Sequence, residues 1–211
     1  MLRLLRSSTI FLAPVYLVSA AHAIDVIGNF PSNDQVASDL DVTFGKAMGF
    51  TMPSGLPYTL DSAILSLFVD DLGAQTAWSF GLFADSNGDP DLSAPLVNLT
   101  LPPLALGDDN YTLTPASPLT LQPNTTYWLV GTSASTSSHG GWNRNDPSKT
   151  PTGLAVSAGA RSGAPPVDPS SFFNSYSIQA TPVPGPLPIL GLYAAFGASR
   201  TLRRRLHQRA M

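Results

Sequence analysis

Apolar and polar residues alternate along most of this chain, and a period of two is typical of half-buried β-strands. In segment 62–69, Ala63 begins a set of apolar residues at every second position, while Ser62 and Ser66 face the other way. Segment 77–84 alternates in the same manner. Further candidate strands cover residues 42–52, 95–101, 110–114, 126–133, 153–160 and 172–181. No part of residues 24–181 carries a long apolar stripe with a 3.6-residue period, so the pattern predicts an all-β fold.

Turn-forming residues separate these strands and indicate how they connect. Clusters of Gly, Pro, Asn and Asp between short strands predict a single antiparallel domain over residues 24–181, either a β-sandwich or a jelly-roll-like fold. Asn87 and Gly88 supply the positive φ angles of a tight turn, so segments 77–84 and 95–101 are expected to pair.

The pattern Leu-x-Pro-x-Thr-x-Tyr, which ends at Tyr127, looks like the tyrosine corner of Greek-key sandwiches. In such a corner the phenol is expected to donate a hydrogen bond to a backbone carbonyl a few residues upstream. Strand alternation then directs Tyr127 toward the core and Trp128 toward the opposite face.

The N-terminus has the order of a secretory signal peptide. Arg3 and Arg6 precede a short apolar run, and Ala21-His22-Ala23 provides the small residues that signal peptidase requires. We therefore expect residues 1–23 to form a signal helix that is cleaved before Ile24. The rest of the chain then begins outside the inner membrane.

A second apolar run covers residues 187–199 and is followed by Arg203, Arg204 and Arg205. Its thirteen residues are fewer than the ~17 that set the lower limit for a membrane-spanning helix. Arginines resist crossing the bilayer. The run is expected to form a marginal transmembrane-type helix, which is either retained as an anchor or removed after use.

Segment 182–211 resembles the PEP-CTERM sorting signal, and the resemblance is carried by Pro184, Pro186, Leu187, Pro188, Arg203, Arg204 and Arg205. Gly185 stands where that family usually has glutamate. The resemblance implies processing by an exosortase-type membrane enzyme in a Gram-negative bacterium that makes extracellular polysaccharide. It also implies transient residence at the inner membrane or periplasm, followed by the cell surface or extracellular matrix.

Residues 24–181 are similar to the choice-of-anchor R domain, a bacterial surface domain that occurs joined to different anchoring signals. The similarity is carried by Trp142 and by residues 58–62, 82–90, 119–130 and 173–176. These motifs are structural, so the resemblance implies no catalytic residues.

Charge and composition narrow the classes of function. The chain has fourteen acidic residues, all of them aspartate and all between residues 24 and 181, where the cations are Lys46, Arg144, Lys149 and Arg161. The net charge of this region is 4 − 14 = −10, which repels nucleic acid and anionic polymers. The chain contains no cysteine, so packing without disulfides must stabilise the exported domain.

Catalytic motifs are scarce in the sequence. His139 is the one histidine of residues 24–181, and it lies among Ser133, Ser135, Ser137 and Ser138 in what the composition predicts to be a flexible loop. No Gly-x-Ser-x-Gly elbow is present. The chain has neither cysteine nor glutamate. The lack of cysteine excludes a catalytic Cys–His pair, and the presence of a single histidine in residues 24–181 excludes a zinc site built from several histidines. Paired aspartates keep a hydrolase open as an alternative.

Two ligand sites are predicted, and no cofactor motif is present. Asp85, Asn87, Asp89 and Asp91 place oxygen-bearing side chains at alternate positions, as at the start of a calcium-binding loop. Pro90 occupies the position of the usual glycine, and a plain hairpin turn is the other interpretation.

Trp142 is the second candidate, because a tryptophan ring in a loop rich in hydrogen-bonding side chains stacks well on a sugar. Packing of Trp142 in the core is the other interpretation.

These features predict an exported, non-enzymatic envelope or matrix protein that is sorted through its C-terminus. One alternative is a carbohydrate-binding module of the cell surface, which requires Trp142 to be exposed beside a groove. The other is a secreted hydrolase in which two aspartates converge in a cleft. The expected partners are the exosortase-type enzyme, the membrane and polysaccharide, and no nucleic acid.

Overall fold

Backbone hydrogen bonds form strands and one short helix, α1 (Ala74–Ala77), in the computed structural model, which describes residues 22–31 and 35–184. No helix within these residues is long and apolar enough to cross a membrane. The predicted signal helix and C-terminal helix lie outside them. The longer strands are β1 (Ile24–Gly28), β3 (Gly45–Thr51), β4 (Tyr58–Val69), β5 (Trp78–Ser86), β8 (Gly107–Pro115), β10 (Thr126–Ser133), β14 (Val156–Gly163) and β16 (Tyr176–Pro182).

Short strands extend this framework at its edges and turns. They are β2 (Gln35–Val36), β6 (Asp89–Pro90), β7 (Val97–Thr100), β9 (Thr120–Leu121), β11 (Gly140–Trp142), β12 (Arg144–Asn145), β13 (Thr152–Gly153) and β15 (Asp168–Ser170). Every predicted strand is found, with ends that differ by a few residues. Strand β1, with five residues, was not predicted, and neither were the two- and three-residue strands, because alternation is hard to recognise over so short a length.

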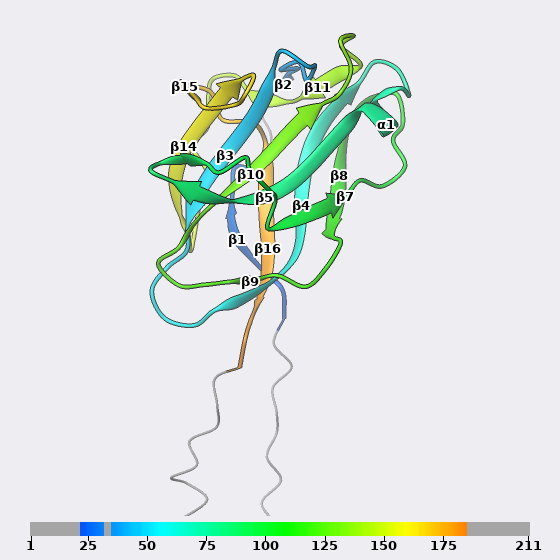
Figure 1. Ribbon diagram of the computed structural model, residues 1–211. Helices are drawn as coiled ribbons and strands as arrows, with labels where there is room; N and C mark the ends of the chain where they lie inside the picture. Colours follow the sequence, from blue (N-terminus) through cyan, green and yellow to red (C-terminus); the bar gives the residue numbers. More distant parts are fainter. Residues whose placement is uncertain (1–21, 32–34, 185–211) are drawn as a thin grey trace, which may run out of the picture.

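Fourteen of the strands form one antiparallel sheet in the order β13-β1-β16-β4-β8-β7-β5-β10-β3-β14-β15, with β6, β9 and β11 paired at its sides. Strands β2 and β12 form a separate two-stranded sheet. The large sheet curls strongly, so that its two halves face each other (Figure 1). The predicted all-β, antiparallel, single-domain class is confirmed, and its strands belong to one continuous curled sheet.

The continuity of the sheet depends on a short pairing between β7 and β8. Leu99 pairs with Pro115, and Thr100 pairs with Thr114. On one side of this junction lie β8, β4, β16 and β1, and on the other side lie β5, β10 and β3. The curl buries the inner faces of both halves against each other, and this burial is the main stabilising contribution of the fold.

Side chains from both halves of the sheet form the core. Strand β4 contributes Leu65 and Leu67, and β5 contributes Phe80 and Leu82, as their alternation predicts. Each fully buried side chain of this kind contributes roughly 1.5–3 kcal/mol. Trp142 lies between the two halves, with its ring centre 5.9 Å from that of Phe80 and 6.4 Å from that of Tyr176.

A smaller apolar cluster covers the opposite face of β10. Trp128 and Val130 pack there with Ala47, and the partly buried Phe83 and Leu92 lie against them. Tyr127 belongs to the main core. The prediction that Tyr127 and Trp128 point to opposite faces is therefore confirmed.

The turn after β5 has the predicted geometry. Asn87 and Gly88 have φ angles of 58° and 90° and connect β5 to the short strand β6. Farther along, Phe80 pairs with Leu99, as expected for segments 77–84 and 95–101.

The first and last strands of the domain are neighbours in the sheet. Ile24 of β1 pairs with Ala180 of β16, and Pro182 pairs with Tyr58 at the start of β4. The two ends of the described domain consequently emerge at the same end of the molecule, whereas β4 finishes at the other end with Val69 (Figure 1).

Candidate functional site

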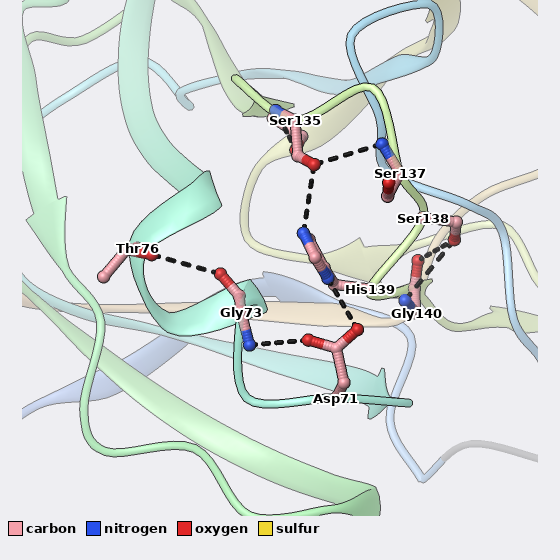
Figure 2. A network of polar contacts seen from close by, with 9 residues as sticks. Asp71, Gly73, Thr76, Ser135, Ser137, Ser138, His139 and Gly140 are labelled. Carbon is pink, nitrogen blue, oxygen red and sulfur yellow. Dashed lines mark hydrogen bonds and ion pairs between the residues drawn. The ribbon is translucent and has the colours of Figure 1, made fainter.

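Asp71, His139 and Ser135 form a continuous polar chain at the end of the domain where β4 finishes. Asp71 follows β4, while Ser135 and His139 belong to the loop between β10 and β11. Nδ1 of His139 lies 2.7 Å from Oδ2 of Asp71, and its Nε2 lies 3.0 Å from Oγ of Ser135. Figure 2 shows the imidazole ring between the carboxylate and the hydroxyl.

Backbone hydrogen bonds hold the loop that carries Ser135 and His139. The carbonyl of His139 accepts the N–H of Asp70 at 2.9 Å, and the carbonyl of Ser135 accepts the N–H of Val42 at 2.8 Å. The loop that the composition predicted to be a flexible tip is thus tied to two other segments of the chain.

The carboxylate of Asp71 has a second hydrogen bond. Its Oδ1 accepts the N–H of Gly73 at 2.6 Å, in the turn that leads into α1. The bond with His139, and then the bond with Gly73, lower the pKa of Asp71 below its ordinary value. An ionised Asp71 side chain, 58% exposed, therefore orients the imidazole of His139, which is 17% exposed.

The order of carboxylate, imidazole and hydroxyl is the one in which histidine takes the proton of a nucleophilic serine. The same contacts also fasten two loops together. Oγ of Ser135 accepts the N–H of Ser137 at 3.1 Å, which fixes the hydroxyl within a local turn.

The sequence identified His139 and its neighbouring serines as candidates but missed Asp71. Asp71 lies 68 residues from His139 along the chain, and such a separation leaves no local pattern to recognise.

The residues of the predicted calcium loop have protein partners. Oδ1 of Asp85 accepts the indole N–H of Trp128 at 2.8 Å. Oδ1 of Asp89 lies 2.6 Å from Nε of Arg161, whose guanidinium also donates to the carbonyl of Gly88. Arg161 thus supplies the positive charge beside this turn.

Asp91 accepts the N–H of Ser93, and Asn87 occupies the turn itself. In the part of the chain that the structure describes, no group of three or more acidic or histidine side chains gathers as a metal would require. The calcium site stays a prediction, and any cation there has to compete with Arg161.

Trp142 is fully buried, so the interpretation that it packs in the core is confirmed and the prediction of an exposed sugar-stacking ring is wrong. Its indole N–H donates to the carbonyl of Ser175 at 2.9 Å, and Phe80 and Tyr176 pack against the ring. The hydrogen-bonding residues around Trp142 in the sequence serve this buried site. No ring face remains for a ligand.

Among the grooves of the described surface are three with volumes of about 500, 630 and 500 Å³. Their lining contains one carboxylate each, from Asp41, Asp25 and Asp85 respectively. None of the three is lined by Ser135, His139 or Asp71. Two converging aspartates, which the hydrolase alternative requires, are therefore not found in these grooves.

Of the predicted sorting residues, Pro184 is described and is exposed. The other sorting residues lie outside the described residues: Pro186, Leu187, Pro188, Arg203, Arg204 and Arg205.

Comparison with known protein families, with curated proteins and with solved structures finds no match for this chain.

Proposed function

We propose that this protein is an exported, non-enzymatic component of the cell envelope or extracellular matrix, sorted through its C-terminus by an exosortase-type system. The observation that carries the proposal is the pairing of Ile24 with Ala180, which brings both ends of the domain together. A chain held at the membrane by its C-terminal segment would then present the loops around Asp71 and His139 away from the membrane.

The boundaries of the domain support this arrangement. Strand β1 starts at Ile24, the residue that follows the predicted cleavage site, so removal of residues 1–23 would leave the sheet intact. The last strand ends at Pro182, and the N–H of Val183 donates to the carbonyl of Pro57. The proline-rich segment therefore follows directly after the last hydrogen-bonded residues of the described domain.

The same proposal includes a family type for the domain and for the tail. The curled sheet would correspond to a jelly-roll-like sandwich of the choice-of-anchor R type, and the tail to a PEP-CTERM signal that has lost its glutamate. The acidic surface, with a net charge of −10 over residues 24–181, would keep the protein away from nucleic acid and anionic polymers.

Intact-mass measurement of the protein recovered from the envelope of its own host tests the proposal. We expect a chain that starts at Ile24 and is processed near Pro184 to Pro188. Replacing Arg203, Arg204 and Arg205 by glutamine should release an uncleaved protein, because each arginine costs ~2.5–3.5 kcal/mol at the bilayer centre. Arg209→Gln is the matched control. Recovery of residues 1–211 with both variants fractionating like the parent would contradict the proposal.

A second candidate function is hydrolysis of an acyl group at Ser135, and the contacts among Asp71, His139 and Ser135 favour it. His139 would take the proton of Ser135 while the hydroxyl oxygen attacks the carbonyl carbon, and the same proton would pass to the leaving group as its bond to that carbon breaks. Attack by a water molecule on the acyl-serine would then release the acid and restore Ser135. A fluorophosphonate probe should then label the wild-type protein and Ser137→Ala, but not Ser135→Ala. No labelling of the wild type rules this candidate out.

A further inference from the structure

The largest of the three grooves crosses the outer face of four neighbouring strands, β1, β16, β4 and β8. It encloses about 630 Å³, within the usual range for small-molecule and cofactor sites. Its lining combines polar side chains with a few apolar ones: Asp25, Phe30, Pro31, Ile64, Asn110, Thr112, Ser177 and Gln179. We call this set the sheet groove.

An apolar centre with a polar border is the main feature of the sheet groove. Ile64 pairs with Ser177 of β16 on one side and with Thr112 of β8 on the other. Because directly opposed residues of an antiparallel pair point to the same face, the two hydroxyls flank the Ile64 side chain. Asn110 lies on the same face of β8, two residues before Thr112.

Part of the polar border is held in place by hydrogen bonds within the protein. Oδ1 of Asp25 accepts the hydroxyl of Ser177 at 2.8 Å and the amide of Gln179 at 3.4 Å. Oε1 of Gln179 in turn accepts the hydroxyl of Ser62 at 3.1 Å. The side chains of Asn110 and Thr112 form no hydrogen bond with the described residues, so their donors and acceptors are available to a ligand.

Phe30 belongs to the lining of the sheet groove and is half-buried. The preceding residue fixes its position, because the buried side chain of Asn29 donates to the carbonyls of Lys149 and Asn174 and accepts the N–H of Tyr176. These bonds anchor the backbone next to Phe30, and an aromatic ring in the lining can pack against the C–H face of a sugar.

We propose that the sheet groove binds a neutral polysaccharide. A sugar ring has apolar C–H faces, which suit Ile64 and Phe30, and an equatorial rim of hydroxyls, which suits Asn110, Thr112 and Gln179. The described lining holds one carboxylate and no lysine or arginine, which disfavours an anionic chain. This inference rests on the proposed envelope or matrix function and names the ligand class that would serve it.

Affinity gel electrophoresis of the intact protein tests this proposal. The protein is run through gels that contain dextran, mannan or hydroxyethylcellulose. We expect at least one of these neutral polymers to retard the wild type. Asn110→Ala and Thr112→Ala should each weaken binding by about tenfold, the loss of roughly one hydrogen bond to the ligand. Both residues lie on the sheet surface, and an unchanged denaturation midpoint confirms that the variants fold.

Asn98→Ala, an exposed asparagine on β7 outside the sheet groove, is the matched control and should be retarded like the wild type. A gel that contains alginate, an anionic polymer, should not retard the protein. Failure of all three neutral polymers, retardation by alginate alone, or equal binding of the Asn110 and Asn98 variants would overturn the inference. Envelope fractionation is measured separately, so an inactive groove in a correctly sorted protein is distinguishable from failure of the proposed function.

Discussion

The phenol oxygen of Tyr127 lies 2.8 Å from the backbone nitrogen of Gln122 and accepts its N–H. The predicted tyrosine corner is therefore present, but the hydrogen bond runs in the direction opposite to the expected one. Tyr127 is buried in the main core. The bond joins the start of β10 to the chain that leads into it.

Tyr127→Phe should lower the free energy of unfolding by roughly 1–3 kcal/mol, because the N–H of Gln122 loses its acceptor in a partly buried site. Urea denaturation measures the change. Tyr58→Phe is the matched control, since the Tyr58 hydroxyl has no hydrogen bond with the described residues. Equal stability of the two variants would show that the corner contributes nothing.

Gly140 has a φ of 112°, and a Cβ at this position would overlap the carbonyl oxygen of Phe68. Gly140→Ala should cost at least ~2 kcal/mol of stability, since a clash with backbone is added to an unfavourable φ. Gly55→Ala separates the two causes: Gly55 has a φ of 118° with open space around it. We expect it to cost ~1 kcal/mol. A smaller loss at Gly140 than at Gly55 would contradict the described pairing of β11 with β4.

The hydrogen bonds to Asp71 predict that the stability of the domain depends on pH. Because the pKa of Asp71 is lower in the folded chain than its ordinary value of 3.8, its stabilising contribution is present above that value and is lost as the pH falls through the lower folded pKa. The melting temperature of the wild type should thus exceed that of Asp71→Asn at about pH 5, and the difference should shrink toward about pH 2.

Asp70→Asn is the control for this measurement, because the Asp70 side chain has no hydrogen-bond partner in the described structure. A difference between wild type and Asp71→Asn that is constant over this pH range would argue against the Asp71–His139 contact.

Calcium should bind the Asp85–Asp91 loop no more tightly than the ~10⁻⁴–10⁻³ M of extracellular modules, since the ion must take Asp89 from Arg161. We expect a rise in melting temperature at ~10 mM calcium chloride, and a larger rise in Arg161→Gln. Asp89→Asn should abolish the effect, whereas Asp109→Asn should not. If calcium leaves all these melting temperatures unchanged, the loop is a plain hairpin turn.

The alternation of residues in the sequence determined which segments form strands and which side chains each strand buries. Leu65 and Leu67 face the core because a strand points alternate side chains to opposite faces, whatever its neighbours are. Asn87 and Gly88 determined a turn, since few residues tolerate positive φ. These features depend on local backbone geometry, which the residue types of a short segment are enough to predict.

Which distant residues meet depends on the packing of the whole domain. The pairing of β7 with β8 joins the two halves of the curled sheet, and the curl places Trp142 between Phe80 and Tyr176. The sequence alone left the exposure of Trp142 open. The contact of His139 with Asp71 likewise depends on how β4 and β11 pair. Such contacts result from the packing of the whole domain, because the free energy that holds them comes from burial shared by many strands rather than from any short segment.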